Sequence, residues 1–315
     1  ADIGGTNSRL AVAITSKKNR EIILKNIQKF KNSDFNNFEE VIEKYLSSSN
    51  DNLISRMCIA AAGIISEDTV EMSNLNWKIT VPSLQKTSNI KSVLIINDLQ
   101  AQGYALDFIK PKDQEKLIEG NYSAAQIDTK LVCGMGTGFN VAIAYQTAFG
   151  TFVPASEYGH ARTTTANEKQ KLIVKQLEEN SSFVSYENIL AGSGLNRLDK
   201  VLNRREDRSP SDILEAAKAG DLKAKEVGSQ LAGFAGQAFG DFALMNMAIG
   251  GVYLIGGFAR AMMPYLKEEN FKQNFYNRGN FSEIMKKISV HLILDDYAAL
   301  KGVQITQQFY LGNKF

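Results

Sequence analysis

The sequence predicts an α/β fold with mixed sheets and two domains. The first hundred residues hold several apolar, strand-like runs separated by helical segments, an order typical of α/β architecture. A second group of strand-like runs begins near residue 130, and helical periodicity dominates the region after it. With 315 residues, of which 44% are hydrophobic, the chain is long enough to bury two separate cores.

In the first hundred residues, the spacing of apolar side chains separates helices from strands. Four apolar residues recur at helical spacing within 37–46 and predict a helix there. A buried strand is expected over 93–96, followed by Asn97 and a helix over 99–106. The other expected strands cover residues 9–14, 21–28, 57–62, 69–73 and 77–81.

The later strands repeat the pattern of the first ones. Residues 130–134 and 140–145 form a strand, turn and strand like those at the N-terminus, and a further strand is expected at 151–154. We interpret this as a faint internal repeat. The helices expected after it cover residues 167–177, 193–202, 211–219 and 221–247.

Two of these helices carry informative residues. Ser209-Pro210 and Ser211-Asp212 are capping candidates for the helix over 211–219. The helix over 221–247 contains four interior glycines, each of which costs about 1 kcal/mol of helix stability relative to alanine. Their presence predicts close packing against another helix, and they are Gly228, Gly233, Gly236 and Gly240.

Two glycine-threonine turns are candidates for binding phosphate. Gly4-Gly5-Thr6-Asn7 follows Asp2, and Gly136-Thr137-Gly138 follows a second apolar run. Glycines let backbone N–H groups face an anion, although either turn alone is also typical of a hairpin loop. The Asp2 carboxyl group is of the kind that holds hydrated Mg²⁺.

A third glycine-rich segment makes a nucleotide site plausible. Glycine pairs bracket the strand-like run from Gly250 to Gly257, where the backbone can lie close to an adenine or a ribose. The sequence contains neither a P-loop nor a strand-turn-helix dinucleotide motif. A nucleotide site would therefore be divided between distant segments of the chain.

A set of carboxylate, amide and imidazole side chains is suited to a polyhydroxylated ligand. Asp98 comes at the end of a buried strand, where open α/β sheets bind ligands, and it lies beside Asn97. The alternative role of Asp98 is to cap the helix that follows. Glu157, His160 and Glu187 offer further acceptors and donors for sugar hydroxyl groups.

In their order and spacing, these motifs resemble the bacterial-type glucokinase family of the hexokinase and actin-like superfamily. The resemblance covers nearly the whole chain and implies a two-domain, actin-like (ribonuclease H-like) sugar kinase fold with a helical insertion in the larger domain. The small domain is expected at 1–108 plus 299–315, and the large one at 109–298. The motifs are Asp2-Ile3-Gly4-Gly5-Thr6-Asn7, Ile96-Asn97-Asp98, Gly136-Thr137-Gly138, Glu157-Tyr158-Gly159-His160, Glu187 before Ala191-Gly192-Ser193-Gly194-Leu195, and Gly250 to Gly257.

The resemblance also implies a reaction and a role for each motif. It implies ATP-dependent phosphorylation of the glucose 6-hydroxyl in a cleft between two domains, with Asp98 as the base and Mg²⁺ held by Asp2 through water. The sugar hydroxyls would be held by Asn97, Glu157, His160, Glu187 and Asn74. The nucleotide would be held by Asp2, Gly4, Gly5, Thr6, Asn7, Gly136, Thr137, Gly138, Gly256 and Gly257.

Two alternatives stay open at this point: a kinase for another hexose, such as mannose or an N-acetylated amino sugar, and a sugar-sensing regulator on the same fold. His160 as a zinc ligand is a weaker interpretation, because Glu157-x-x-His160 lacks a second histidine. A related group of repressors and sugar kinases has a cysteine-rich zinc motif after this position. This chain has no cysteine from 134 to 315, so we expect the zinc-free group.

Charge and cysteine content indicate the kind of partner and compartment. The 36 Lys and Arg residues nearly balance 34 Asp and Glu residues, which favours neither nucleic acid nor an anionic membrane as a partner. Cys58 and Cys133 lie in apolar runs and are expected to be small buried residues, which fits a cytoplasmic protein. The resemblance implies a homodimer.

The N-terminal residues and one long apolar stretch give two further expectations. The first residues show no secretory signal pattern, and a few residues of the first strand are expected to precede Ala1. The apolar stretch 242–259 has the composition of a membrane span, but its four glycines and a buried Asn246 predict a helix end followed by a strand.

The chain departs from the family pattern at several positions, among them Ala62-Gly63, which occupies the usual Gly-Pro. Asn140 stands where the family has a small glycine after the second turn, Tyr158 stands where glycine is common, and Lys301 replaces an apolar residue. Asparagine tolerates a left-handed backbone better than most residues. Asn140 and Tyr158 adjoin expected site residues and bear on hexose preference and rate.

Overall fold

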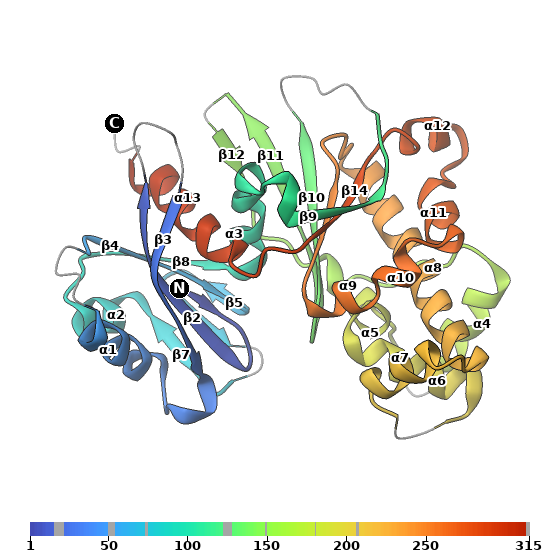
Figure 1. Cartoon of the computed structure of the whole chain (residues 1–315), viewed down its shortest axis with the longest axis horizontal. Helices are drawn as coiled ribbons and strands as arrows, with labels where there is room; N and C mark the ends of the chain where they lie inside the picture. Colours follow the sequence, from blue (N-terminus) through green and yellow to red (C-terminus); the bar gives the residue numbers. More distant parts are fainter. Residues whose placement is uncertain are drawn as a thin grey trace. The chain divides into compact units, whose positions relative to one another are not determined.

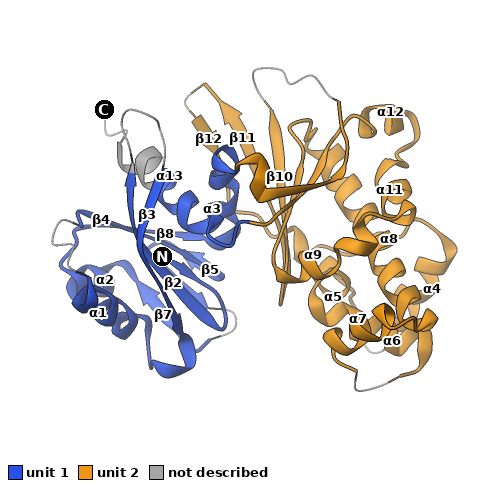
Figure 2. Ribbon diagram, viewed as in Figure 1, with its two compact units in different colours: residues 1–109, 295–315 blue, residues 110–294 orange. Residues whose placement is uncertain are grey.

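The chain forms two compact units (Figures 1 and 2). Our computed structural model describes residues 1–15, 22–49, 54–72, 75–121, 128–148, 150–179, 181–205 and 208–312. The first unit comprises residues 1–109 and 295–315, blue in Figure 2, and the second comprises residues 110–294, orange. The boundaries expected from the sequence fell after residues 108 and 298.

The first unit is built on a mixed five-stranded sheet with the order β3-β2-β1-β4-β8. β1 runs parallel to β4, and β4 parallel to β8, whereas β1 and β3 both pair with β2 in antiparallel fashion. Short strands β5, β6 and β7 form a second sheet. The strands are β1 (Asp2–Ile3), β2 (Asn7–Thr15), β3 (Ile22–Lys31), β4 (Arg56–Ala61), β5 (Gly63–Ser66), β6 (Thr69–Met72), β7 (Lys78–Thr80) and β8 (Ser92–Asn97).

Capping residues and apolar faces define the helices of this unit. The α1 helix starts because the side chain of Asn37 accepts the N–H of Glu40, and its buried face includes Phe38 and Val41. Near the end of the chain, Lys301 forms an ion pair with Asp295 at 2.5 Å. The helices are α1 (Phe38–Ser48), α2 (Val81–Ser88), α3 (Asp98–Ala105) and α13 (Ala298–Gly312).

The second unit repeats the strand arrangement of the first unit's main sheet. Its sheet has the order β12-β11-β10-β13-β14-β9 (Figure 1). As in the first unit, a central strand, β10, has an antiparallel neighbour after a tight turn and a parallel neighbour on its other side. The internal repeat expected from the sequence is therefore present in the topology. The strands are β9 (Gln114–Ile118), β10 (Thr129–Met135), β11 (Phe139–Thr147), β12 (Gly150–Phe152), β13 (Val252–Ile255) and β14 (Val290–Ile293).

The long helix α8 (Leu222–Met245) packs closely against α11 (Glu269–Tyr276), as its glycines predict. A methyl group at Gly236 would lie 2.3 Å from the carbonyl oxygen of Phe271, and one at Gly240 would lie 2.6 Å from that of Phe275. Only glycine permits such an approach. The other helices of this unit are α4 (Glu168–Glu178), α5 (Tyr186–Leu190), α6 (Gly192–Asn203), α7 (Pro210–Lys218), α9 (Gly257–Ala261), α10 (Met263–Leu266) and α12 (Ser282–Met285).

Two expectations about the apolar segments are met, and one is wrong. The stretch 242–259 holds the end of α8 and then β13, and both cysteines are free, buried thiols. Burial raises the pKa of Cys58 to about 12. Asn246, however, is only half-buried, and its amide donates to the hydroxyl group of Tyr158. Within the described part of the chain, no helix is both long and apolar enough to cross a membrane.

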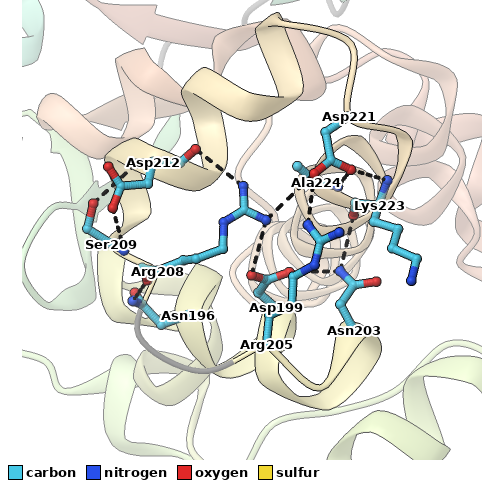
Figure 3. A network of polar contacts seen from close by, with 10 residues as sticks. All are labelled: Asn196, Asp199, Asn203, Arg205, Arg208, Ser209, Asp212, Asp221, Lys223 and Ala224. Atoms are coloured by element: carbon cyan, nitrogen blue, oxygen red, sulfur yellow. Dashed lines mark hydrogen bonds and ion pairs between the residues drawn. The ribbon is translucent and has the colours of Figure 1, made fainter.

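A network of charged and amide side chains joins α6, α7 and α8 (Figure 3). Asp199, which is almost fully buried, accepts a hydrogen bond from the Asn203 amide at 2.7 Å and lies 3.6 Å from the Arg208 guanidinium. Asp221 caps α8 by accepting two backbone N–H groups, and it pairs with Arg205 at 2.8 Å. The network therefore ties the start of α8 to the loop before α7.

The network also includes the start of α7, where the capping residues predicted from the sequence are found. Ser209 is the N-cap, Pro210 is the first helical residue, and Asp212 completes the capping box. Arg208, the residue before the cap, donates to the backbone carbonyl of Asp212 at 3.4 Å. The same guanidinium thus connects the cap of α7 with the carboxylates of Asp199 and Asp221.

The Asp221→Asn variant is expected to lose stability in a pH-dependent way. The Arg205 side chain, followed by backbone N–H groups, lowers the pKa of Asp221 below its ordinary value. The ionised form therefore stabilises the fold above about pH 4, and this contribution disappears as the pH falls through the lowered pKa. Asparagine keeps the N-cap but removes the charge, so the melting temperature should drop at pH 7.

Thermal denaturation of the parent protein and of Asp221→Asn at pH 7 and near pH 3 measures this effect. The difference between their melting temperatures should be smaller at the lower pH. Asp68→Asn, at an exposed aspartate in the first unit, serves as the control and should change little at either pH. A loss of equal size at both pH values would show that the Asp221 charge is not the stabilising feature.

Candidate active site

The first glycine turn is held from outside by a buried asparagine. Gly4 donates its N–H to the carbonyl of Asn7 at 3.0 Å, which closes the turn between β1 and β2. Asn32, only 2% exposed, donates its amide to the Gly4 carbonyl at 2.8 Å and its backbone N–H to the Thr6 carbonyl at 3.0 Å. Its side-chain oxygen accepts from the hydroxyl group of Ser8 at 2.8 Å. Thr6 itself is exposed and available to a ligand.

The Asp2 carboxylate lies at the base of this turn and faces a cation across the sheet. Arg9 is its cross-strand neighbour and donates to Asp2 at 3.3 Å. Burial raises the pKa of Asp2, and the positive charge of Arg9 opposes that shift. The sequence analysis did not single out Arg9, although residues opposite each other in an antiparallel pair are direct neighbours.

Asp2 fits the kind of metal site that the sequence predicts. A single carboxylate beside a turn that is expected to bind phosphate suits Mg²⁺, which takes one or two carboxylates and completes its shell with water and phosphate oxygens. Among the described residues, no three or more His, Cys, Asp or Glu side chains gather into a group that could hold a metal ion.

Asn97 and Asp98 lie at the same edge of the sheet as the first turn. In the strand register, Ile3 of β1 pairs with Ala61 of β4, and Ala61 pairs with Asn97 of β8. These three strands are parallel, so their carboxyl ends meet at one edge, where open sheets bind ligands. The fold thus brings Asp2, the first turn and Asp98 to one edge of this unit.

The alternative role of Asp98 as a helix cap is wrong. The N-cap of α3 is Asn97, whose side-chain oxygen accepts the N–H of Leu99 at 2.9 Å and whose own N–H donates to Gln100 at 3.0 Å. Asp98 is the first helical residue, and its Oδ1 atom also accepts the Leu99 N–H. The cap therefore fixes the backbone from which the Asp98 carboxylate extends.

The second glycine turn connects β10 and β11 and lies against the start of α6. Gly136 donates its N–H to the carbonyl of Gly138 at 2.9 Å, and its own carbonyl accepts the N–H of Gly192 at 2.9 Å. No atom lies within 4 Å of the position that a methyl group on Gly136 would occupy, so this side of the turn is open. The turn is thus held in place while its outer surface stays accessible.

The glycine pair expected to face adenosine directly follows the neighbouring strand. β13 is parallel to β10, with Ile255 beside Gly134, so Gly256 follows β13 close to the second turn. Gly256 has a φ of +106°, and a methyl group there would lie 2.2 Å from the Met135 carbonyl oxygen. Both facts require glycine. A methyl group on Gly257 would meet no atom within 4 Å, which leaves room for a ligand.

The carboxylates expected to bind the sugar accept hydrogen bonds from the first two residues of β11. The N–H of Phe139 donates to Glu187 at 3.0 Å, and the side-chain amide of Asn140 donates to Glu157 at 2.8 Å. The His160 imidazole lies 3.8 Å from the same Glu157 oxygen. The side chains of Glu157 and His160 are 59% and 63% exposed, so both are accessible to a sugar.

The expected site residues thus form one cluster in each unit. The first unit holds Asp2, Gly4, Gly5, Thr6, Asn7, Asn97 and Asp98; the second holds Gly136, Thr137, Gly138, Glu157, His160, Glu187, Gly256 and Gly257. Asn74 lies outside the described residues. Arg9, Asn32 and the supporting role of Asn140 were not predicted from the sequence, because a contact between side chains or loops of different elements leaves no local pattern.

Comparison with solved structures shows the class of protein that this fold defines. The fold is that of the sugar kinases with an actin-like architecture. The glucokinase from an Antarctic psychrotroph superposes with a TM-score of 0.87 at 27% identity, over 97% of this chain and 96% of that one. A glucokinase from Balamuthia mandrillaris, at 18% identity and a TM-score of 0.74, shares the fold.

Sequence comparison then shows the family. A family model described as Glucokinase matches residues 1–309. A glucokinase from Colwellia psychrerythraea is 30% identical, over 96% of this chain and 93% of its own length, and one from Campylobacter jejuni subsp. doylei is 29% identical, over 100% and 95%. The chain belongs to the Glucokinase family, whose members are hexose phosphotransferases.

The Asn32→Ala variant is expected to weaken nucleotide binding selectively. It removes the hydrogen bonds to the Gly4 carbonyl and from Ser8 at a buried position, so the first turn loses its support. Because an unsatisfied buried polar group costs about 1–3 kcal/mol, we expect the KM for ATP to rise about fivefold or more and the melting temperature to fall. Steady-state kinetics at saturating sugar measure the effect.

The matched control is Asn36→Ala, since Asn36 is an exposed asparagine whose amide contacts only the nearby Glu40 carboxylate among the described residues. This variant should keep the parent KM for ATP. An unchanged KM for ATP in Asn32→Ala would mean that Asn32 supports the fold without influencing the turn.

Proposed function

We propose that this protein transfers the γ-phosphoryl group of ATP to the 6-hydroxyl of glucose. The observation that carries the proposal is the match to the Glucokinase family over residues 1–309, together with Asp98 at the carboxyl end of β8, at the same sheet edge as the first turn. We also propose that the two units act as the small and large domains of one kinase, each supplying one cluster.

In the proposed reaction, the Asp98 carboxylate accepts the proton of the sugar 6-hydroxyl as that oxygen bonds to the γ-phosphorus. The bond from the γ-phosphorus to the β,γ-bridging oxygen breaks, and ADP leaves. Phosphoryl transfer needs mainly positioning and charge stabilisation, with a base that orients the nucleophile. The capped start of α3 supplies the positioning, because Asn97 and Gln100 fix the backbone at Asp98.

The N–H groups of both glycine turns are proposed to hold the phosphates, and the Thr6 and Thr137 hydroxyls add donors. Asp2 would hold Mg²⁺ through water, and the bound cation would supply neutralisation of phosphate charge. Arg9 would keep Asp2 oriented, since its guanidinium lies 3.3 Å from the carboxylate. Gly256 and Gly257 would lie along the adenosine.

Sugar recognition is proposed to come from Glu157, Glu187, His160 and Asn97. Carboxylates accept from hydroxyl groups, whereas an amide or imidazole N–H donates to them. Glu157 and His160, whose side chains lie 3.8 Å apart, would present an acceptor and a donor side by side. A site of this kind rejects sugars that leave its polar groups unpaired.

We extend the proposal to the remaining properties of the family resemblance. ATP and Mg²⁺ are proposed as the phosphoryl donor and metal, with no zinc, and a homodimer as the assembly. Because both cysteines are free thiols and the substrate is ATP, we propose a cytoplasmic protein. Glucose is the proposed sugar, and ADP release measured with glucose, mannose and N-acetylated amino sugars identifies the preferred substrate and tests the proposed function.

The Asp98→Asn variant is expected to lose at least about a hundredfold in kcat, because general-base catalysis is typically worth that much or more. The amide keeps the shape of the side chain and part of its hydrogen bonding, so glucose affinity should stay within about tenfold. Coupled ADP-release kinetics and titration calorimetry with glucose measure the two effects. Activity above about a tenth of the parent value would rule out Asp98 as the base.

Glu157→Gln and His160→Ala are each expected to raise the KM for glucose by about tenfold. Each variant removes or weakens a proposed hydrogen bond to a sugar hydroxyl group. The KM for ATP should stay within about twofold. Glu168→Gln, an exposed glutamate on α4, is the control and should leave both values unchanged. Equal rises in both KM values would argue against a sugar-specific role.

A further inference from the structure

We propose that Asn140 is a positioning residue that holds the Glu157 carboxylate ready for the sugar. This inference rests on the proposed function, since it concerns how the sugar site is built. Asn140 stands where the sequence resemblance leads us to expect a glycine, which has no side chain to do this. The contact with Glu157 is therefore made by a side chain that the family pattern does not predict.

The amide of Asn140 uses its full hydrogen-bonding capacity on one loop and its own strand. Its Nδ2 atom donates to the carbonyl of Ser156 at 2.9 Å and to Glu157 Oε2 at 2.8 Å. Its Oδ1 atom accepts the N–H of Gly159 at 3.1 Å and that of Val141 at 2.8 Å. An asparagine side chain offers two donors and two acceptor lone pairs, so every one of them has a partner.

These contacts also fix the orientation of the amide. A flipped side chain would place its oxygen against the Ser156 carbonyl and the Glu157 carboxylate, and its NH₂ group against two N–H donors. Because the flipped arrangement is repulsive at every contact, the amide has one stable orientation. The donor that faces Glu157 is therefore always present.

The loop that carries Glu157 is attached to β11 at further points. The hydroxyl group of Ser156 donates to the carbonyl of Val141 at 2.6 Å, and a methyl group at Gly159 would lie 1.9 Å from the Phe139 carbonyl oxygen. The backbone of 156–159 thus has a defined place, whereas the Glu157 side chain is 59% exposed. The Asn140 hydrogen bond orders a side chain that would otherwise sample several rotamers.

Ordering the carboxylate before the sugar arrives lowers the cost of binding, because an immobilised side chain loses rotamer entropy when a ligand must do the ordering. Asn140 leaves the rest of the carboxylate open to sugar hydroxyls. The adjoining residue Phe139 holds Glu187 in the same way through its N–H. Two consecutive residues of β11 therefore position both carboxylates of the proposed sugar site.

Asn140 is half-buried and adjoins the second glycine turn, but its side chain is directed at the sugar loop. Its loss should therefore affect the sugar and spare the nucleotide. We expect Asn140→Ala to raise the KM for glucose about threefold to tenfold, the range for a hydrogen bond to a charged group at an accessible site, and to leave the KM for ATP within about twofold.

A double-mutant cycle with Glu157→Ala tests whether Asn140 acts through Glu157. Once Glu157 is absent, Asn140→Ala should change the KM for glucose by less than about twofold. Deoxyglucose analogues, each lacking one hydroxyl group, give a second readout. The analogue whose KM differs less from that of glucose in Glu157→Ala should be the same one in Asn140→Ala. If Asn140 only stabilised the fold, the two variants would not affect the same hydroxyl group.

Asn140→Asp keeps the Oδ1 acceptor for Gly159 and Val141 but replaces the donor with a second carboxylate beside Glu157. It should raise the KM for glucose more than Asn140→Ala does, because two neighbouring carboxylates repel each other. This variant provides the test if Asn140→Ala does not fold. Asn274→Ala, at an asparagine on α11 that bonds to Asn270, is the control and should match the parent.

The outcomes separate this proposal from the function on which it depends. If the unmodified protein phosphorylates none of the hexoses tested, the proposed function fails and the role of Asn140 fails with it. If the unmodified protein is active and the Asn140 variants keep the parent KM for glucose, only the positioning role is overturned. It is also overturned if Asn140→Ala has its full effect in the absence of Glu157.

Discussion

Both clusters of functional residues depend on one arrangement of strands. A central strand, β1 in the first unit and β10 in the second, has a parallel neighbour on one side and turns back into an antiparallel neighbour on the other. The reversal occurs at the carboxyl end of the central strand. Exposed backbone N–H groups of the turn therefore lie at the edge where parallel strands end and where open sheets bind ligands. This arrangement places Asp98 at the same sheet edge as the first turn and Gly256 beside the second.

Such short turns cannot satisfy their own backbone groups, so they depend on residues from elsewhere in the chain. Asn32, which follows β3, holds the first turn, and the N–H of Gly192 at the start of α6 holds the second. Asn140 plays a similar part for the loop of Glu157. An asparagine suits these positions because one short side chain can both donate and accept. The residues that bind ligands and those that support them are thus different, and the latter lie in distant segments.

Local sequence patterns predicted the elements that have a strong local cause. The helices α1, α4, α6, α7 and α8 were expected within a few residues of their ends, since each has apolar periodicity and all but α6 also begin with a capping side chain. Short elements such as β9, β14 and α5 were not expected. Four or five residues carry too little periodicity, and β9 and β14 exist because neighbouring strands pair with them. The cap of α3 was assigned to Asp98 in one interpretation, although Asn97 fills that position.

The sequence by itself determined the two-part α/β organisation, the repeated glycine turns, the family and the identity of the expected site residues, because these depend on residue type and spacing. Only the tertiary structure decided which side chains support them. The contacts of Arg9 with Asp2, of Asn32 with the first turn and of Asn140 with Glu157 join residues between 7 and 28 positions apart. Hydrogen bonds of this kind are chosen by strand register and loop docking, which arise when the sheets assemble and leave no periodic trace in the chain.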